Sequence, residues 1–254
     1  MSDSTEQLAP DRSATVHRRF SRGLHEIVLH RGSWRELFLT ALPVANEGPE
    51  PMLERLAAVV ERHDARILSQ TLFHIAEHRQ AALDTIQQRL GPIRWPITWL
   101  EDGEGSPHLI GANVHAVAGL DVATIESDGR TIGTVYDDGS ARTCELGDLR
   151  DADVARSRPD QARRVLDDMI AVLARTGMSF RDVVRTWFYN DDILDWYGEF
   201  NRVRNTFFTE HGVYDGLVPA STGIGASNPF GAALTAGLIA VRPTDKRVSA
   251  AAVP

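Results

Sequence analysis

The spacing of apolar residues in the first half of the chain changes between the two-residue period of strands and the 3.6-residue period of helices. Met52, Leu56 and Val59 recur at helical spacing behind Pro49 and Pro51, and a proline at the start of a helix costs no hydrogen bond. The pattern predicts helices over residues 49–63 and 77–90. It predicts strands over residues 25–29, 36–42, 67–74, 93–99 and 109–118.

The second half of the chain repeats this order of elements. Asp128-Gly129 lies between two alternating runs, which is a strong signal for a two-residue hairpin turn. Strands are predicted over residues 122–127, 130–136, 141–146, 182–189, 218–224 and 233–241, and helices over 159–176 and 193–211. The repetition indicates an internal duplication. We therefore predict a flexible tail over 1–23, a first unit over 24–120, a second unit over 121–243 and a tail over 244–254.

The composition narrows the class of protein. Asp and Glu number 35 against 27 Lys and Arg, a net charge of −8, and no basic stripe is present, so nucleic acid is not an expected partner. Neither a membrane-spanning run nor a signal peptide is expected, since apolar runs are short and the first residues are polar. The lone Cys144 excludes a disulfide within the chain and favours the cytoplasm. We expect no cofactor and no metal.

Several motifs of the second half occur together. They are Ala171-Val172-Leu173-Ala174-Arg175-Thr176-Gly177, Asp182-Val183-Val184-Arg185-Thr186-Trp187-Phe188, Phe207-Phe208-Thr209-Glu210-His211, Val218-Pro219-Ala220-Ser221 and Leu238-Ile239-Ala240-Val241-Arg242. Through these motifs residues 160–242 resemble the YjgF/RidA superfamily, also described as L-PSP endoribonucleases, and the first unit resembles a diverged member. The resemblance implies an α+β fold of tandem chorismate-mutase-like units, each a mostly antiparallel sheet with two helices on one face. It also implies assembly around a three-fold axis, with ligands in clefts between units.

Two positions depart from the deaminases of this family. Those enzymes hold the carboxylate of an imino acid with an arginine two residues after a motif proline, and they place an acid in the last strand. Here Ser221 and Thr98 occupy the arginine positions, and neither predicted last strand contains Asp or Glu. A single hydroxyl does not replace a bidentate guanidinium. Conventional imine deamination is therefore not expected.

A closer pattern resembles the corresponding domain of chorismatases and their tandem-domain relatives. Arg185, Trp187 and Tyr189 are followed by Tyr197, Asn201, Arg204 and Phe208 and by the run over residues 219–225. In those relatives a further domain supplies catalytic groups, including a glutamate. The alternatives left open are that a partner chain supplies them, that the sequence is part of a longer one, or that the chemistry differs.

The predicted strand over residues 182–189 carries the main binding candidates. Alternation places Val184, Thr186 and Phe188 under the helices, and Arg185 with Tyr189 on the open face. A charged side chain there needs a ligand or an ion-pair partner, so Arg185 either binds a carboxylate or pairs with the neighbouring unit. The same phase would put Gln70 and His74 on the open face of the first unit.

Hydroxyls followed by glycines in the run from Ser221 allow backbone N–H groups to approach an anion, although a turn satisfied by its own hydroxyls is the alternative. We predict catalytic roles for Ser221, Thr222 and Tyr189, and substrate binding by Arg185, Arg204 and Gly223. Arg204 has a solvated helix face as its alternative, and His115 is either a general base or a hydrogen-bonded core histidine.

These features favour an enzyme with hydrolase or lyase chemistry on a small carboxylate metabolite, acting as a homo-oligomer, with a trimer completing the three-fold clefts. The alternative is a non-catalytic ligand-binding or assembly protein that has lost the deaminase site. A ribonuclease would need a basic groove, which the charge balance disfavours. The sequence pattern identifies no general acid or base.

Overall fold

A computed structural model describes residues 15–101 and 110–251. Its first six strands form one sheet in the order β1-β2-β3-β6-β4-β5. The elements are β1 (Thr15–Ser21), β2 (Leu24–Arg31), β3 (Trp34–Ala41), α1 (Pro49–Arg62), β4 (Ala65–Phe73), α2 (Arg79–Leu90), β5 (Ile97–Leu100) and β6 (Gly111–Ala118). Within this sheet β4 and β5 are parallel, and the other neighbouring strands are antiparallel.

The second six strands form another sheet in the order β11-β10-β12-β9-β8-β7. The elements are β7 (Val122–Ser127), β8 (Arg130–Asp137), β9 (Ala141–Leu149), α3 (Arg158–Arg175), β10 (Val183–Asn190), α4 (Ile193–Glu210), β11 (Ala220–Gly225) and β12 (Leu234–Pro243). Here β10 and β11 form the parallel pair. The predicted α+β class, with mostly antiparallel sheets, is confirmed.

The two sheets are copies of one arrangement, because strands β1 to β6 correspond in order and pairing to β7 to β12. Both copies carry an irregularity at the same place, between Ile67 and Ser69 in β4 and between Val183 and Arg185 in β10. A bulge at one position of both sheets makes Ser69 the counterpart of Arg185. The internal duplication expected from the order of elements is therefore present in the fold.

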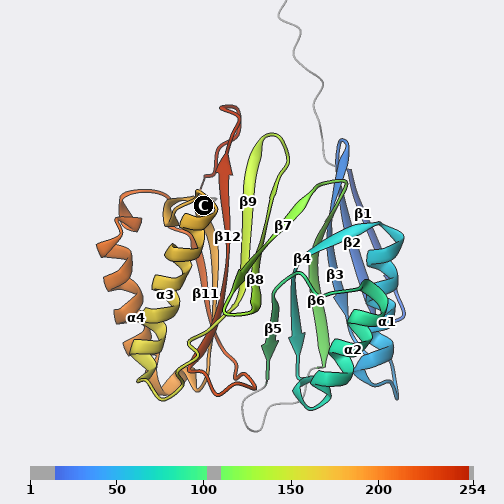
Figure 1. Cartoon of the computed structure of the whole chain (residues 1–254), viewed down its shortest axis with the longest axis horizontal. Helices are drawn as coiled ribbons and strands as arrows, with labels where there is room; N and C mark the ends of the chain where they lie inside the picture. Colours follow the sequence, from blue (N-terminus) through green and yellow to red (C-terminus); the bar gives the residue numbers. More distant parts are fainter. Residues whose placement is uncertain (1–14, 102–109, 252–254) are drawn as a thin grey trace, which may run out of the picture.

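The helices lie on the two outer sides of the molecule, and the sheets face each other between them (Figure 1). Across this interface the Thr134 hydroxyl donates to the Leu68 carbonyl over 2.9 Å. Gly147 lies so close to the first unit that a Cβ there would be 3.2 Å from the Thr98 hydroxyl. The open faces of the two sheets thus meet directly and form the walls of any space between them.

Each unit has its own apolar core between its sheet and its helices. The buried side chains of α1 include Met52, Leu56 and Val59, as the helical spacing predicted. Ser157 caps α3 by accepting from the Asp160 N–H, which satisfies one of the free donors of the first turn. No helix in the described ranges is long and apolar enough to cross a bilayer.

The main departure from the prediction is β1. A flexible tail was expected over residues 1–23, but β1 pairs along its whole length with β2. All seven residues of β1 are exposed, so the strand lacks the buried apolar alternation by which strands are recognised. The predicted strand over 93–99 is shorter in the structure, where β5 covers Ile97–Leu100. Residues 1–14 and 252–254 of the two predicted tails lie outside the described ranges.

Candidate functional site

A cleft of about 340 Å³ lies between the two sheets and is lined by both units. On the first unit, Thr40, Asn113, Thr71 and Thr98 stand side by side across β3, β6, β4 and β5. All four side chains line the cleft. This wall therefore offers hydroxyl and amide groups that are uncharged.

The neighbouring row of the same wall consists of Phe38, His115 and Ser69. The imidazole of His115 is stacked on the ring of Phe38, with centroids 4.5 Å apart and planes 7° from parallel. Stacking fixes the plane of the imidazole, so that its two nitrogens point along defined directions.

The second unit supplies Glu145 from β9 and Trp187 and Tyr189 from β10. Glu145 Oε2 lies 2.7 Å from His115 Nδ1, and its Oε1 accepts a hydrogen bond from the Ser69 hydroxyl. Glu145 is only 7% exposed, yet it lines the cleft. The contact joins an acid of one unit to a histidine and a serine of the other.

A second carboxylate holds the opposite side of the imidazole. Glu36 Oε1 lies 3.2 Å from His115 Nε2, and Glu36 Oε2 accepts from Arg31 over 2.9 Å. Burial alone would lower the pKa of His115, but the two carboxylates raise it to about 10. A carboxylate oxygen at each ring nitrogen favours the imidazolium form, which has no free nitrogen to accept a proton as a general base would.

The cleft carries little net charge. Of the described residues that line it, His115 and Glu145 are the charged ones, and none is Arg or Lys. Burial raises the pKa of Tyr189, so its hydroxyl stays protonated and can donate. The wall thus combines one ion pair with neutral hydrogen-bonding groups.

Of the six predicted site residues, Tyr189 lines this cleft, and Arg185 and Thr222 lie beside Trp187, which also lines it. Arg185 donates to the Thr222 hydroxyl over 2.5 Å, and its guanidinium lies 5.0 Å from the ring centroid of Trp187. Tyr189 is two residues further along the same face of β10 and lines the cleft. By register, Thr222 and not Ser221 is the counterpart of Thr98.

The other three predicted residues lie elsewhere. Alternation along β11 turns Ser221 and Gly223 away from Thr222, and a Cβ on Gly223 would be 3.4 Å from the Tyr197 ring of α4. Arg204 lies on α4, on the helix-covered side of the sheet, with its guanidinium 5.9 Å from the ring of Phe200. The structure does not bring these three to the cleft.

The predicted phase is wrong for Gln70 in β4 and, in β10, only for the residues before the bulge. Gln70 is 1% exposed and accepts from the Trp95 indole on the core side of β4, whereas Ser69 and Thr71 face the cleft. His74, at the end of β4, lies 3.1 Å from Glu101 rather than in the cleft. In β10 the extra residue places Val183 in the core, although Thr186 and Phe188 face the helices as expected.

Sequence reasoning missed Glu145 and Glu36. The family resemblance implies an acid in the last strand of each unit, whereas Glu145 lies in the third strand of the second unit. The local pattern did not single out Glu145, because Arg142, Thr143 and Asp148 lie in the same strand. Its partner, His115, comes from the other unit, and no spacing along the chain reveals that contact.

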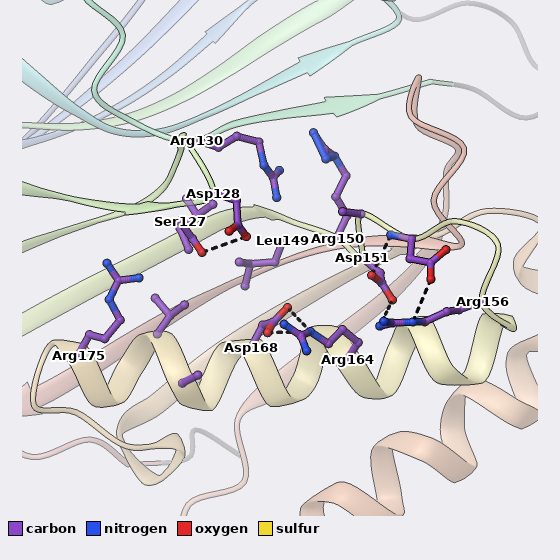
Figure 2. A pocket seen from close by; sticks show the side chains of 15 residues that line it. Ser127, Asp128, Arg130, Leu149, Arg150, Asp151, Arg156, Arg164, Asp168 and Arg175 are labelled. Atoms are coloured by element: carbon purple, nitrogen blue, oxygen red, sulfur yellow. Dashed lines mark hydrogen bonds and ion pairs between the residues drawn. The ribbon is translucent and has the colours of Figure 1, made fainter.

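A second cavity of about 360 Å³ lies in the second unit, against α3. Figure 2 shows arginines and aspartates around it, and some of their charges are paired within the wall. Arg156 lies 3.0 Å from Asp151, and Arg164 lies 3.1 Å from Asp168. The inter-unit cleft remains the stronger candidate for the functional site, because it brings a buried acid of one unit against a histidine and a serine of the other.

Comparison with known proteins defines the class by fold. A chorismatase crystal structure has a TM-score of 0.65 at 10% identity, covering 89% of this chain and 79% of its own. The likeness extends over both units, so the chain has the tandem architecture of that fold. At this identity the likeness concerns the fold alone.

The sequence of the second unit also matches a known family. Residues 135–229 match the family model described as Endoribonuclease L-PSP, which confirms the resemblance inferred from the motifs of this unit. Single-unit structures are also similar over 47% of this chain and 93% of theirs, namely E. coli TdcF with bound serine (24% identity, TM-score 0.38) and E. coli YjgF (25%, 0.36). A comparison with curated protein sequences gives no match.

Proposed function

We propose that the protein is an enzyme of hydrolase or lyase type that binds a small carboxylate metabolite in the cleft between its two units. The observation that carries the proposal is the Glu145 carboxylate, which lies on the cleft wall and is held by His115 and Ser69 of the other unit. A carboxylate held in place beside a bound molecule is a group that exchanges protons with it.

Arg185 is the proposed anchor for the carboxylate of the metabolite. Arg185, Ile239 and Glu145 occupy one row across three adjacent strands, so their outer members are about 10 Å apart, two strand spacings. The guanidinium would exchange its contact with Thr222 for the bidentate contact that a carboxylate offers. Tyr189 lies beside this row and donates a hydrogen bond to the bound molecule.

Glu145 is the proposed acid and base. In a hydrolysis it takes a proton from water as the water oxygen attacks, and it returns that proton to the leaving group. The neutral wall of threonines and Asn113 binds the uncharged part of the metabolite. His115 and Ser69 hold the Glu145 side chain in place from the other unit during these steps.

The test combines ligand-dependent thermal shift with turnover on a panel of imino acids, chorismate and other small carboxylates. At ligand 100-fold above its Kd, binding adds about 2.7 kcal/mol to the free energy of unfolding. The shift should be lost in Arg185→Gln and kept in Glu145→Gln, while turnover falls roughly 100-fold or more in Glu145→Gln. Arg175→Gln is the matched control, because Arg175 lines the second cavity.

Each outcome has a definite meaning. Binding that depends on Arg185 without turnover supports the non-catalytic alternative. A shift that disappears in Arg175→Gln places the ligand in the second cavity. No shift with any carboxylate, in protein shown to be folded, overturns the proposal.

Copies of the chain are also proposed to associate with one another. The internal interface joins β4 and β5 of the first unit to β8 and β9 of the second. Their counterparts are β10 with β11 and β2 with β3, and within residues 15–101 and 110–251 no comparable contact joins this second pair of faces. Ile224 is 42% exposed on one of these faces and Phe38 is 40% exposed on the other. A second copy that repeats the internal interface would cover both.

A further inference from the structure

Glu36 touches the functional site only through another residue. It lies on β3 and is absent from the cleft lining, yet its carboxylate is 3.2 Å from His115 Nε2. Its side chain is 13% exposed, which removes most of the water that would otherwise solvate the charge. Contacts with His115 and Arg31 lower the pKa of Glu36, against the upward effect of burial.

The geometry around His115 has one consistent protonation state. Each ring nitrogen faces a carboxylate oxygen, Nε2 that of Glu36 and Nδ1 that of Glu145. A carboxylate only accepts hydrogen bonds, so both nitrogens must carry a hydrogen for both contacts to be favourable. If one carboxylate is removed, a neutral imidazole can donate its single N–H to the remaining carboxylate, and the second nitrogen no longer needs a hydrogen.

Other groups near the imidazole do not replace Glu36. Among the described residues, the charged and titratable groups that contact the imidazole or its two carboxylates, or line the cleft beside it, are Arg31 on β2, Glu36 on β3, Tyr136 on β8, Glu145 on β9 and Tyr189 on β10. Arg31 is a cation, and both tyrosines have a raised pKa and are neutral at pH 7. Glu36 is therefore the one anion in this set, apart from Glu145 itself, that favours the imidazolium.

We propose that Glu36 is a positioning residue that holds His115 as a fixed imidazolium against Glu145, so that proton exchange with the bound metabolite falls to Glu145 alone. This inference rests on the proposed function for its catalytic meaning. Its structural content, the protonation state of His115, can be measured without any substrate.

The experiment follows the imidazole signals of the chain by NMR as a function of pH, with His115 assigned from the signal missing in His115→Gln. In the wild type His115 should titrate near pH 10. In Glu36→Gln, which preserves shape, the midpoint should fall by about 1–3 units because one neighbouring charge is lost. Turnover by Glu36→Gln should then change with pH at the new His115 midpoint, whereas turnover by the wild type should show no such step below pH 9.

Glu26 provides a matched control. It lies on the adjacent strand β2 with the same kind of partners, 2.6 Å from His63 and 2.6 Å from Arg62. Glu26→Gln removes an equivalent contact but should leave the His115 midpoint and the turnover profile unchanged. Circular dichroism on both variants establishes that the fold is intact.

The outcomes separate this inference from the proposed function. A His115 midpoint that stays near pH 10 in Glu36→Gln, or that moves equally in Glu26→Gln, overturns the role of Glu36 whatever the activity. A midpoint that falls only in Glu36→Gln supports it, even if the wild type shows no turnover and the proposed function fails. If the pH profile of turnover changes together with the fall of the His115 midpoint, the role of Glu36 in catalysis is supported as well.

Discussion

His115 links the cleft to the stability of the whole fold. Its pKa in the folded state, about 10, lies above the ordinary value of 6.5. The stability that this residue contributes is therefore fully present below pH 6.5 and is lost as the pH rises towards 10. Between pH 7 and 9 the free energy of unfolding should fall by at most about 2.7 kcal/mol, since one proton gives about 1.36 kcal/mol per pH unit.

Denaturant unfolding of the wild type and His115→Gln at pH 7 and pH 9 measures this decline. The variant should lose most of the slope while remaining folded. The window ends at pH 9 because Cys144, with a pKa raised to about 12, adds its own loss of stability at higher pH. An identical slope in both proteins would contradict the assignment of the buried charge to His115.

At the level of elements, the approach of β8 to β9 depends on a single glycine. A Cβ on the buried Gly133 would lie 2.8 Å from the carbonyl oxygen of Glu145. Gly133→Ala should therefore reduce the free energy of unfolding by about 1–3 kcal/mol, because packed strands must separate. Gly198, in α4, has no atom within 4 Å of an added Cβ, so Gly198→Ala should instead add roughly 0.5–1 kcal/mol. Equal effects in the two variants would refute this argument.

Periodicity predicted the order of the elements, because each helix and most strands bury one regular face. It could not predict the phase of β4 beyond its bulge, or the faces of Val183 and Val184 before the bulge of β10, since a bulge inserts one residue and turns the following side chains to the opposite face. Gln70 was assigned to the wrong face for this reason. All residues of the edge strand β1 are exposed. The sequence indicated this strand only indirectly, because the second copy begins with a strand, β7, that had no predicted counterpart in the first copy.

Less of the site than of the fold could be predicted from the sequence. Tyr189 and Arg185 were identified because a strand places alternate residues on one face. Glu145 and His115 are 30 residues apart in the chain and meet only after two separate sheets dock. Local patterns contain no information on such a contact, so the acid of the site could not be predicted from the sequence.

For the molecule as a whole, the repeated interface predicts self-association. Sedimentation velocity should give a mass above the 28.0 kDa of one chain. Ile224→Glu should shift the protein towards the monomer, since it places a charge on the exposed face of β11. Val154 is similarly exposed, at 48%, but lies outside that face, and Val154→Glu should leave the mass unchanged. A wild-type monomer at all concentrations would exclude this form of assembly.

The connection between the two sheets is short, because β6 ends at Ala118 and β7 begins at Val122. Docking of one sheet on the other is therefore intramolecular, with an effective concentration in the millimolar range. The walls of the cleft stay together at any dilution of the protein, whatever the oligomer does. The interface is thus free to carry hydroxyls and a buried ion pair where separate subunits would need apolar surface to hold them together.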